Sequence, residues 1–238
     1  MALETSTRRG SVALGTGRAV FEADLAEGRS HAADLLPELE RLSALAGIPP
    51  PGKGGGSFES IVVGTGPGSY TGLRVGMATA LGLARATGAR LLGLPSIEAL
   101  AFEELSPGEE ASILLDARAN LFYFARYRRE ERDLTPLVPP CAVTATEIEE
   151  RLPPRGLVLG GGVAVEELGH SPHWRDRLRI VVPRARALLA LGRRRMELGA
   201  AGSLELEPLY LMAPPARPGG LAPPSDLPDT ANPERTPR

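Results

Sequence analysis

One stretch, residues 61–88, constrains the fold of this chain more than any other. The β-branched run Ile61–Val63 is too short for a helix and predicts a buried strand. A glycine-rich loop follows, and residues 72–87 are mostly good helix formers. Thr71 is in place to cap this helix and Gly88 to end it. We therefore expect a strand, a tight glycine loop and a helix.

The glycine loop allows two interpretations. Its backbone amides lie at a helix N-terminus, where the partial positive charge favours an anion such as phosphate. Alternatively, the glycines serve only sharp turning and close packing. The loop is not a Walker A motif, because no Gly-Lys-Ser/Thr follows it. It is not a dinucleotide fingerprint either, because Gly64, Gly66 and Gly68 give the spacing G-x-G-x-G.

The helix expected over residues 72–87 carries two rows of side chains at helical spacing. The first is an apolar stripe formed by Leu73, Met77, Leu81 and Ala84. The second consists of small residues four apart, namely Gly72, Gly76 and Ala80. Small residues let another backbone approach closely, which serves packing inside a protein and also suits helix docking between chains.

Composition narrows the class of protein. The chain has 238 residues, of which 42% are hydrophobic, enough for a core in one large or two small domains. A net charge of −2 with a pI near 6.0 creates no global field that attracts nucleic acid. The single cysteine, Cys141, excludes an internal disulfide and favours a reducing compartment. No apolar run reaches membrane length and no signal-peptide core is evident, so we expect a cytoplasmic protein.

The sequence GTGPGSYTGLRVG at residues 64–76 resembles the GPGSFTGLRIG signature of the TsaB (YeaZ) family. The resemblance extends over about residues 1–212 and implies an α/β fold with two lobes of the actin-like/sugar-kinase/Hsp70 ATPase superfamily (ASKHA, ribonuclease H-like). We expect residues 1–105 to form the first lobe with the partner-docking helices and residues 106–212 the second lobe. Residues 213–238 are rich in proline and charge, which predicts a disordered tail.

The resemblance also implies a function. TsaB-like proteins are non-catalytic partners of TsaD in bacterial synthesis of the tRNA nucleoside threonylcarbamoyladenosine (t6A). The expected partners are a TsaD homologue and the ATPase TsaE, with a homodimer when TsaD is absent, tRNA reached only through the complex, and no membrane. The modified base would be adenosine 37 of tRNAs reading codons that begin with A. Two alternatives remain open: a metal-dependent enzyme of the TsaD type (M22, glycoprotease-like), or an ASKHA ATPase or kinase.

Site residues follow from the resemblance position by position. The docking surface is expected on two helices, at His31, Leu35, Leu39, Leu73, Arg74, Gly76, Met77, Ala80, Leu81 and Ala84. No cofactor is expected to be required, although weak ATP or ADP binding at or near the partner interface is implied. Candidates for contacting that nucleotide are Glu4, Ser6, Gly66, Gly68, Gly160 and Gly161. Glu4 stands where the family usually has aspartate, which adds one methylene to the side chain.

We expect no catalytic and no metal-binding residues. TsaD-like enzymes carry His-x-x-x-His on the first helix, whereas here His31 is followed by Leu35. His170 and His173 are separated by a Ser-Pro pair and lack further ligands. Residues 116–118, Asp-Ala-Arg, have two possible roles that the sequence does not separate: an ion pair that stabilises a turn, or a contact in the cleft. For residues 193–195, three arginines, we expect a solvated helix face.

Overall fold

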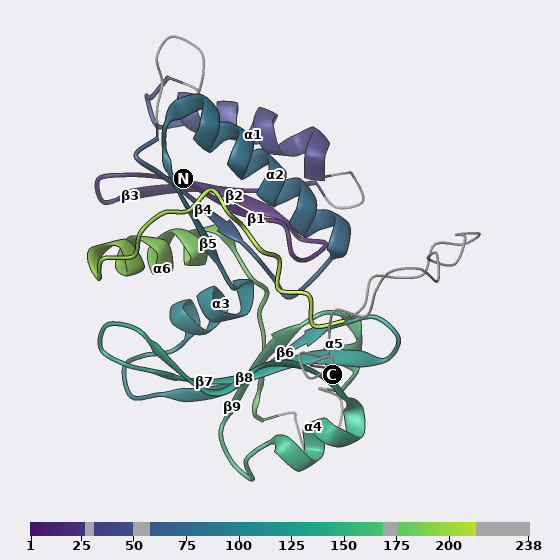
Figure 1. Ribbon diagram of the computed structural model, residues 1–238. Helices are drawn as coiled ribbons and strands as arrows, with labels where there is room; N and C mark the ends of the chain where they lie inside the picture. The colour runs from purple at the N-terminus through teal and green to yellow at the C-terminus, as the bar shows by residue number, and fades with distance from the viewer. Residues whose placement is uncertain (27–30, 50–57, 169–175, 213–238) are drawn as a thin grey trace, which may run out of the picture.

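The computed structural model describes residues 1–26, 31–49, 58–168 and 176–212, and it divides into two lobes, each built on a five-stranded sheet (Figure 1). The predicted tail, residues 213–238, and the pair His170 and His173 lie outside the described residues. In the described part of the chain, no helix is both long and apolar enough to span a bilayer.

The first sheet has the strand order β3-β2-β1-β4-β5. Its strands are β1 (Ala2–Glu4), β2 (Ser11–Thr16), β3 (Ala19–Asp24), β4 (Ser60–Gly64) and β5 (Arg90–Leu94). Helices α1 (His31–Leu45) and α2 (Tyr70–Thr87) cover one face, and α6 (Ala185–Glu197) covers the other (Figure 1). Side chains alternate between the two faces, so that Leu3 packs towards α1 and α2 while Ala2 packs towards α6.

The second sheet has the order β10-β9-β6-β7-β8. It contains β6 (Glu110–Asp116), β7 (Leu121–Arg129), β8 (Leu134–Thr144), β9 (Leu157–Gly161) and β10 (Leu178–Ile180). Helices α4 (Ala145–Arg151) and α5 (Val163–Leu168) pack on one face. Helix α3 (Ser96–Glu104) lies between the lobes and shares a core cluster with the other face (Figure 1).

The two sheets repeat one topology. In the first sheet, the central strand β1 pairs antiparallel with β2 on one side and parallel with β4 on the other. In the second sheet, the central strand β6 pairs in the same way with β7 and β9. Glu4 ends β1 and Asp116 ends β6, so an acidic residue occupies the same topological position in each lobe.

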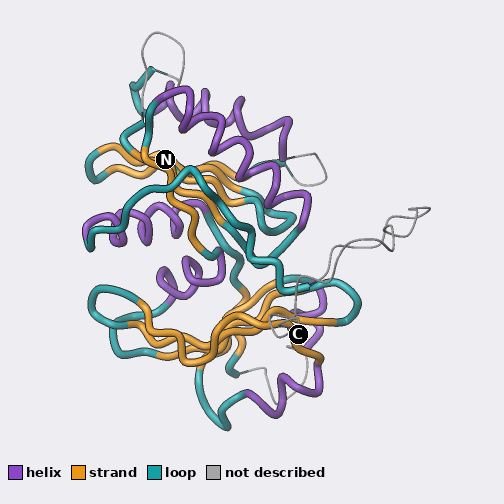
Figure 2. The backbone as a smooth tube through the Cα atoms, in the orientation of Figure 1, coloured by secondary structure: helices purple, strands orange, loops and turns teal. Residues whose placement is uncertain are grey.

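The end of the described chain returns to the first lobe. After α6, the amide of Ser203 donates to the Leu91 carbonyl at 2.8 Å, and the amide of Leu209 donates to the Thr65 carbonyl at 2.8 Å. Figure 2 shows this segment as a loop that runs across the first lobe. A part of residues 106–212, expected to form the second lobe, therefore packs on the first sheet.

The strand, glycine loop and helix predicted over residues 61–88 are present, one local prediction is wrong, and one strand was not predicted. Ser69, not Thr71, caps α2: its hydroxyl accepts from the Gly72 amide, while Gly88 ends the helix in the left-handed region as expected. Strand β8 was not predicted at all, because it contains three prolines. It lies at the edge of its sheet, where missing amide donors are tolerated.

Candidate functional site

The turn after β1, residues 4–6, packs against the start of α2. The Ser69 amide donates to the Ser6 carbonyl at 2.6 Å, and the Thr5 hydroxyl donates to the Gly72 carbonyl at 2.8 Å. A Cβ on Gly68 would lie 2.2 Å from the Ser6 carbonyl oxygen, and one on Gly72 would lie 2.1 Å from the Thr5 carbonyl oxygen. These glycines are therefore required for close packing inside the chain.

Glu4 is fully buried in this turn. One carboxylate oxygen, Oε1, accepts from the Ser6 amide at 2.7 Å. The other, Oε2, is buried without a hydrogen-bond partner, as are the hydroxyls of Ser6 and Ser96. Burial raises the pKa of the Glu4 carboxyl above its ordinary value, and the neighbouring Ser6 and Ser96 partly oppose this shift.

The glycine loop passes directly over this carboxyl. A Cβ on Gly64 would lie 2.5 Å from Glu4 Oε2 and 2.5 Å from the Ser96 hydroxyl. Gly66 has a φ of 105°, a backbone conformation that residues with a side chain rarely adopt. A Cβ at this position would lie 3.0 Å from the Leu73 side chain. Contacts within the chain thus account for the glycines of the loop, as the packing interpretation requires.

The nucleotide candidates fall into two groups. Glu4, Ser6, Gly66 and Gly68 lie together at the start of α2. Gly160 and Gly161 lie in the second lobe, where Cβ atoms would meet the carbonyl oxygens of Leu114 at 2.1 Å and Val181 at 2.5 Å. In both groups, close packing within the chain explains why the residues are glycines. Nucleotide binding by these residues stays a prediction.

Asp116 has a role that neither interpretation of its turn included. Its two carboxylate oxygens accept from the amides of Ala164 and Val165, each at 3.0 Å. A carboxylate at this position satisfies free amides in the first turn of α5. Arg118 is exposed. The cap joins residues 48 and 49 positions apart, which explains why the sequence did not reveal it.

His31 begins α1 and its ring Nε2 lies 3.0 Å from the Thr7 carbonyl oxygen. One turn later, Leu35 is 1% exposed and belongs to the core of the first lobe. Among the described residues, no cluster of three or more His, Cys, Asp or Glu side chains could hold a metal ion.

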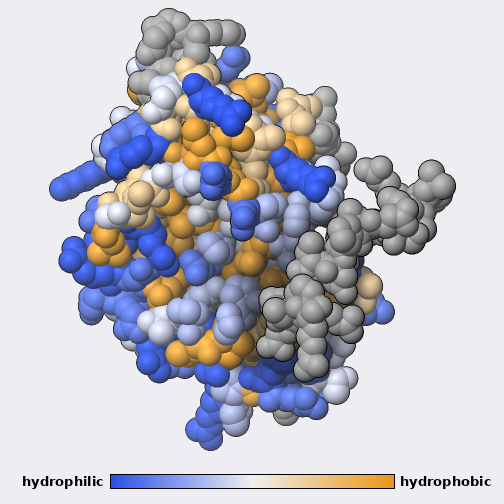
Figure 3. Space-filling view, viewed as in Figure 1, coloured by the Kyte–Doolittle hydropathy of each residue, from blue (hydrophilic) through white to orange (hydrophobic). Residues whose placement is uncertain are grey.

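The expected docking surface needs correction, because most of its residues are inside the chain. The buried members are Leu35, Leu39, Leu73, Gly76, Met77, Ala80 and Ala84. They face the chain's own sheet, the turn after β1 or the glycine loop, since a helix that covers a sheet must bury its apolar stripe inside the chain. His31 and Leu81 are half-buried, and only Arg74 is exposed. Figure 3 shows hydrophobic surface interrupted by hydrophilic side chains over the upper lobe, where α1 and α2 lie.

A cluster on the outer side of α2 joins two distant parts of the sequence. The rings of Tyr70 and Tyr210 stack with centroids 4.9 Å apart. The Arg74 guanidinium lies 3.9 Å from the Tyr70 ring centroid, and its Nε donates to the Tyr210 hydroxyl at 3.1 Å. Sequence analysis included Arg74 but not the tyrosines, because the C-terminal segment meets α2 only in the folded chain.

Residues 193–195 of α6 do not form the solvated face that the sequence predicts. Arg194 and Arg195 are half-buried and reach the β7–β8 turn of the second lobe. Arg195 pairs with Asp133 at 2.9 Å and with Glu98 of α3 at 3.4 Å. These contacts connect the two lobes.

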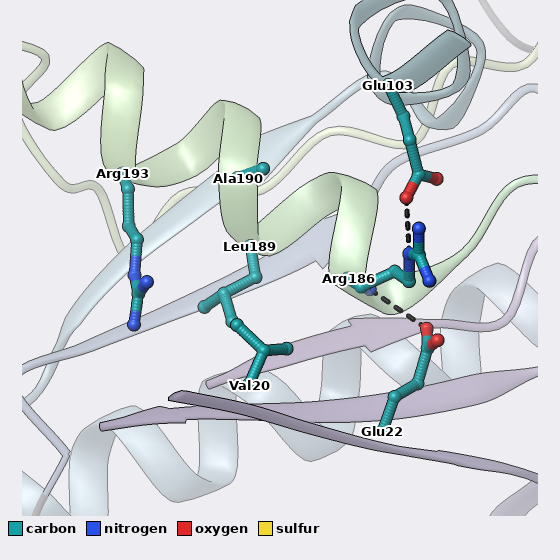
Figure 4. A pocket seen from close by; sticks show the side chains of 7 residues that line it. All are labelled: Val20, Glu22, Glu103, Arg186, Leu189, Ala190 and Arg193. Atoms are coloured by element: carbon teal, nitrogen blue, oxygen red, sulfur yellow. Dashed lines mark hydrogen bonds and ion pairs between the residues drawn. The ribbon is translucent and has the colours of Figure 1, made fainter. Parts of the chain in front are cut away.

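A pocket of ≈ 340 Å³ lies between β3, α3 and α6 (Figure 4). Its lining residues are Val20, Glu22, Glu103, Arg186, Leu189, Ala190 and Arg193. Arg186 connects two walls, because its side chain pairs with Glu103 and its amide donates to Glu22. Both carboxylates of the pocket are thus paired with arginines of the chain, Glu103 with Arg186 and Glu22 with Arg184.

Comparison with known proteins agrees with this architecture. A family model described as "TsaD: tRNA N6-adenosine threonylcarbamoyltransferase" matches residues 26–185. The TsaB protein of Haemophilus influenzae is 34% identical over 134 residues, which cover 55% of this chain and 54% of that protein. The TsaB protein of Escherichia coli is 30% identical over 139 residues, which cover 56% and 57%. The chain therefore spans about half the length of the curated relatives it matches.

Solved structures match over more of the chain. A protein from Pseudomonas aeruginosa with similarity to peptidase YeaZ superposes with a TM-score of 0.74 at 25% identity, covering 89% of this chain and 98% of that one. YeaZ from the same organism gives a TM-score of 0.71 at 26% identity, covering 88% and 98%.

The repeated sheets and the helices that cover them define a two-lobed α/β protein of the ASKHA type. The chain belongs to the tRNA N6-adenosine threonylcarbamoyltransferase (TsaD) family, as a member of its TsaB (YeaZ) group.

Proposed function

We propose that this protein is a non-catalytic subunit in the synthesis of threonylcarbamoyladenosine in tRNA. It pairs with a TsaD homologue and acts with TsaE in the cytoplasm, so that adenosine 37 is modified in tRNAs reading codons that begin with A. It reaches tRNA through this complex, forms a homodimer when TsaD is absent, and requires no cofactor. Any ATP or ADP binds weakly, at or near the partner interface.

The observation that carries the non-catalytic role is the environment of His31. The position one turn later is Leu35, which is in the core, and the His31 ring already contacts the Thr7 carbonyl. A histidine pair on this helix would have to displace core packing. The match to a model named for a threonylcarbamoyltransferase favours one alternative, in which this chain performs the transfer itself.

The decisive experiment measures threonylcarbamoyladenosine in tRNA by mass spectrometry from cells depleted of this protein. Complementation with the wild-type chain should restore the nucleoside. Complementation with His31→Ala or Glu4→Gln should restore it equally well, because neither side chain takes part in chemistry. Loss of the nucleoside with a His31→Ala chain that is stably folded and still binds the TsaD homologue would favour the alternative in which this chain is the enzyme.

Partner binding is tested separately. The chain should co-purify with the TsaD homologue of the same organism, and the comparison with and without ATP measures the contribution of nucleotide. Analytical ultracentrifugation of the chain alone should give a dimer. Failure to bind TsaD under both conditions would contradict the proposal.

A further inference from the structure

Residues 203–212, here called the strap, follow α6 and contact both lobes. The amides of Ser203 and Leu209 bond the strap to β5 and to the loop after β4. Leu206 packs against the core of the first lobe, and Leu211 packs against the cluster that α3 shares with the second sheet. Figure 1 shows this segment descending from the first sheet to the second lobe. The strap therefore spans the junction between the lobes.

The strap and the arginines of α6 hold opposite sides of this junction. In Figure 1 the end of α6 and the β7–β8 turn lie at the left, whereas the strap reaches the second lobe at the right. Arg194 and Arg195 fix the left side through that turn. The chain also passes between the lobes in the segments before β6 and before α6. Attachments on opposite sides resist a hinge motion that the arginines and these segments alone would permit.

The strap is held more weakly than the sheets beside it. Every residue from 203 to 212 is half-buried or exposed, and the segment contains neither helix nor strand. Val62, on the neighbouring β4, is by contrast fully buried. A segment with few buried contacts opens at a free energy well below that of global unfolding. We therefore expect the strap to detach while both sheets stay folded.

The strap covers the carboxyl ends of β4 and β5. A Cβ on Gly93 of β5 would lie 2.9 Å from the Leu206 Cδ2 atom. A Cβ on Gly66 of the glycine loop would lie 3.5 Å from the Leu209 carbonyl oxygen. In open α/β sheets, ligands bind beyond the carboxyl ends of the strands. The strap occupies this position in the first lobe, and its release uncovers the glycine loop.

We propose that residues 203–212 are a releasable strap that sets the angle between the two lobes. When bound, the strap prevents hinge motion and covers the ends of β4 and β5. When released, it lets the lobes move and exposes the glycine loop. This conformational device goes beyond the proposed function and is a property of the chain alone, so it is tested without a partner.

Amide hydrogen exchange of the full chain tests whether the strap is released. In wild type, the amides of Ser203 and Leu209 should exchange at least about 100-fold faster than that of Val62. Leu206→Asp places a carboxylate against the core of the first lobe and should speed exchange at both strap amides by about another tenfold. Leu204→Asp is the matched control, because Leu204 lies in the same segment and is 51% exposed. It should leave both rates unchanged.

The angle between the lobes has its own readout. Cys141→Ser removes the single native cysteine. Gly82→Cys on α2 and Glu150→Cys on α4 then place nitroxide labels at exposed positions, one in each lobe. Double electron–electron resonance should give one narrow distance distribution. In this background Leu206→Asp should broaden the distribution, whereas Leu204→Asp should not.

Leu211→Asp releases the strap from the other lobe and should broaden the distribution as Leu206→Asp does. The inference is overturned if the distribution stays narrow in both variants, or if Leu204→Asp has the same effect as they have. Strap amides that exchange as slowly as the Val62 amide would also overturn it. So would circular dichroism melts in which both strap variants fail to fold, since the strap would then be part of the core.

Discussion

Gly76 of α2 lies directly against Thr5: a Cβ on residue 76 would be 2.2 Å from the Thr5 hydroxyl oxygen. That hydroxyl donates to the Gly72 carbonyl one turn earlier. The row of small residues on α2 therefore serves contact between two segments of the same chain, and a partner cannot reach it while the first lobe is folded.

Gly76→Ala should destabilise the protein by about 1–3 kcal/mol, because the added methyl overlaps Thr5 and disturbs its hydrogen bond. Gly82→Ala is the control. It places the same methyl in open space on the same helix and should stabilise the protein by about 0.5–1 kcal/mol. Urea unfolding measures both. Equal effects at the two positions would show that residue 76 has room for a side chain.

Met77→Glu should prevent stable folding. Met77 is 8% exposed and packs in the core of the first lobe, where an unpaired charge costs several kcal/mol. Ala78→Glu, at the next and exposed position, should fold normally. Circular dichroism melts separate the two. A Met77→Glu variant that folds cooperatively and loses only partner binding would contradict this prediction and show that Met77 belongs to the partner interface.

Glu4→Gln should change how stability depends on pH. Burial raises the pKa of Glu4, so the native state binds this proton more tightly than the unfolded state does. The contribution to stability is therefore complete below the ordinary carboxyl pKa and is lost as pH rises through the raised pKa.

Glutamine does not titrate, so its contribution to stability does not change with pH. The free energy of unfolding of Glu4→Gln should therefore increase relative to that of wild type as pH rises above about 4.5. Urea titrations at a series of pH values measure the difference. Glu205→Gln, at an exposed position, is the control. A constant difference between Glu4→Gln and wild type across this range would contradict the raised pKa.

Arg195→Ala should weaken the junction of the lobes. It removes ion pairs to Glu98 and Asp133 in half-exposed surroundings, where we expect a cost of about 1–2 kcal/mol. Glu98 would then be left without its cation, although burial already raises its pKa. The double variant Arg195→Ala/Glu98→Gln should recover part of the loss. A double-mutant cycle in urea gives the coupling, and a value near zero would mean that this pair does not join the lobes.

The sequence by itself determined the local structure. The C-terminal end of α2, the glycine loop and the strand before it follow from residues within a few positions of one another. The capping box of α4, in which Thr144 and Glu147 bond to each other's amides, is likewise a local pattern. Local hydrogen bonds and turn conformations depend little on the rest of the chain, which is why such patterns can be read directly.

The tertiary structure alone decided which side of each helix is inside. Periodicity identified the stripe of Leu73 and Met77 but could not say whether it faces the chain's own core or a partner. Both residues are buried within the chain, Met77 in the core cluster of the first lobe and Leu73 against Gly66 of the glycine loop. The cap that Asp116 provides for α5 and the contact of Tyr210 with Arg74 join segments 48 to 136 residues apart. Such contacts depend on how distant segments pack in three dimensions, and no local spacing encodes that.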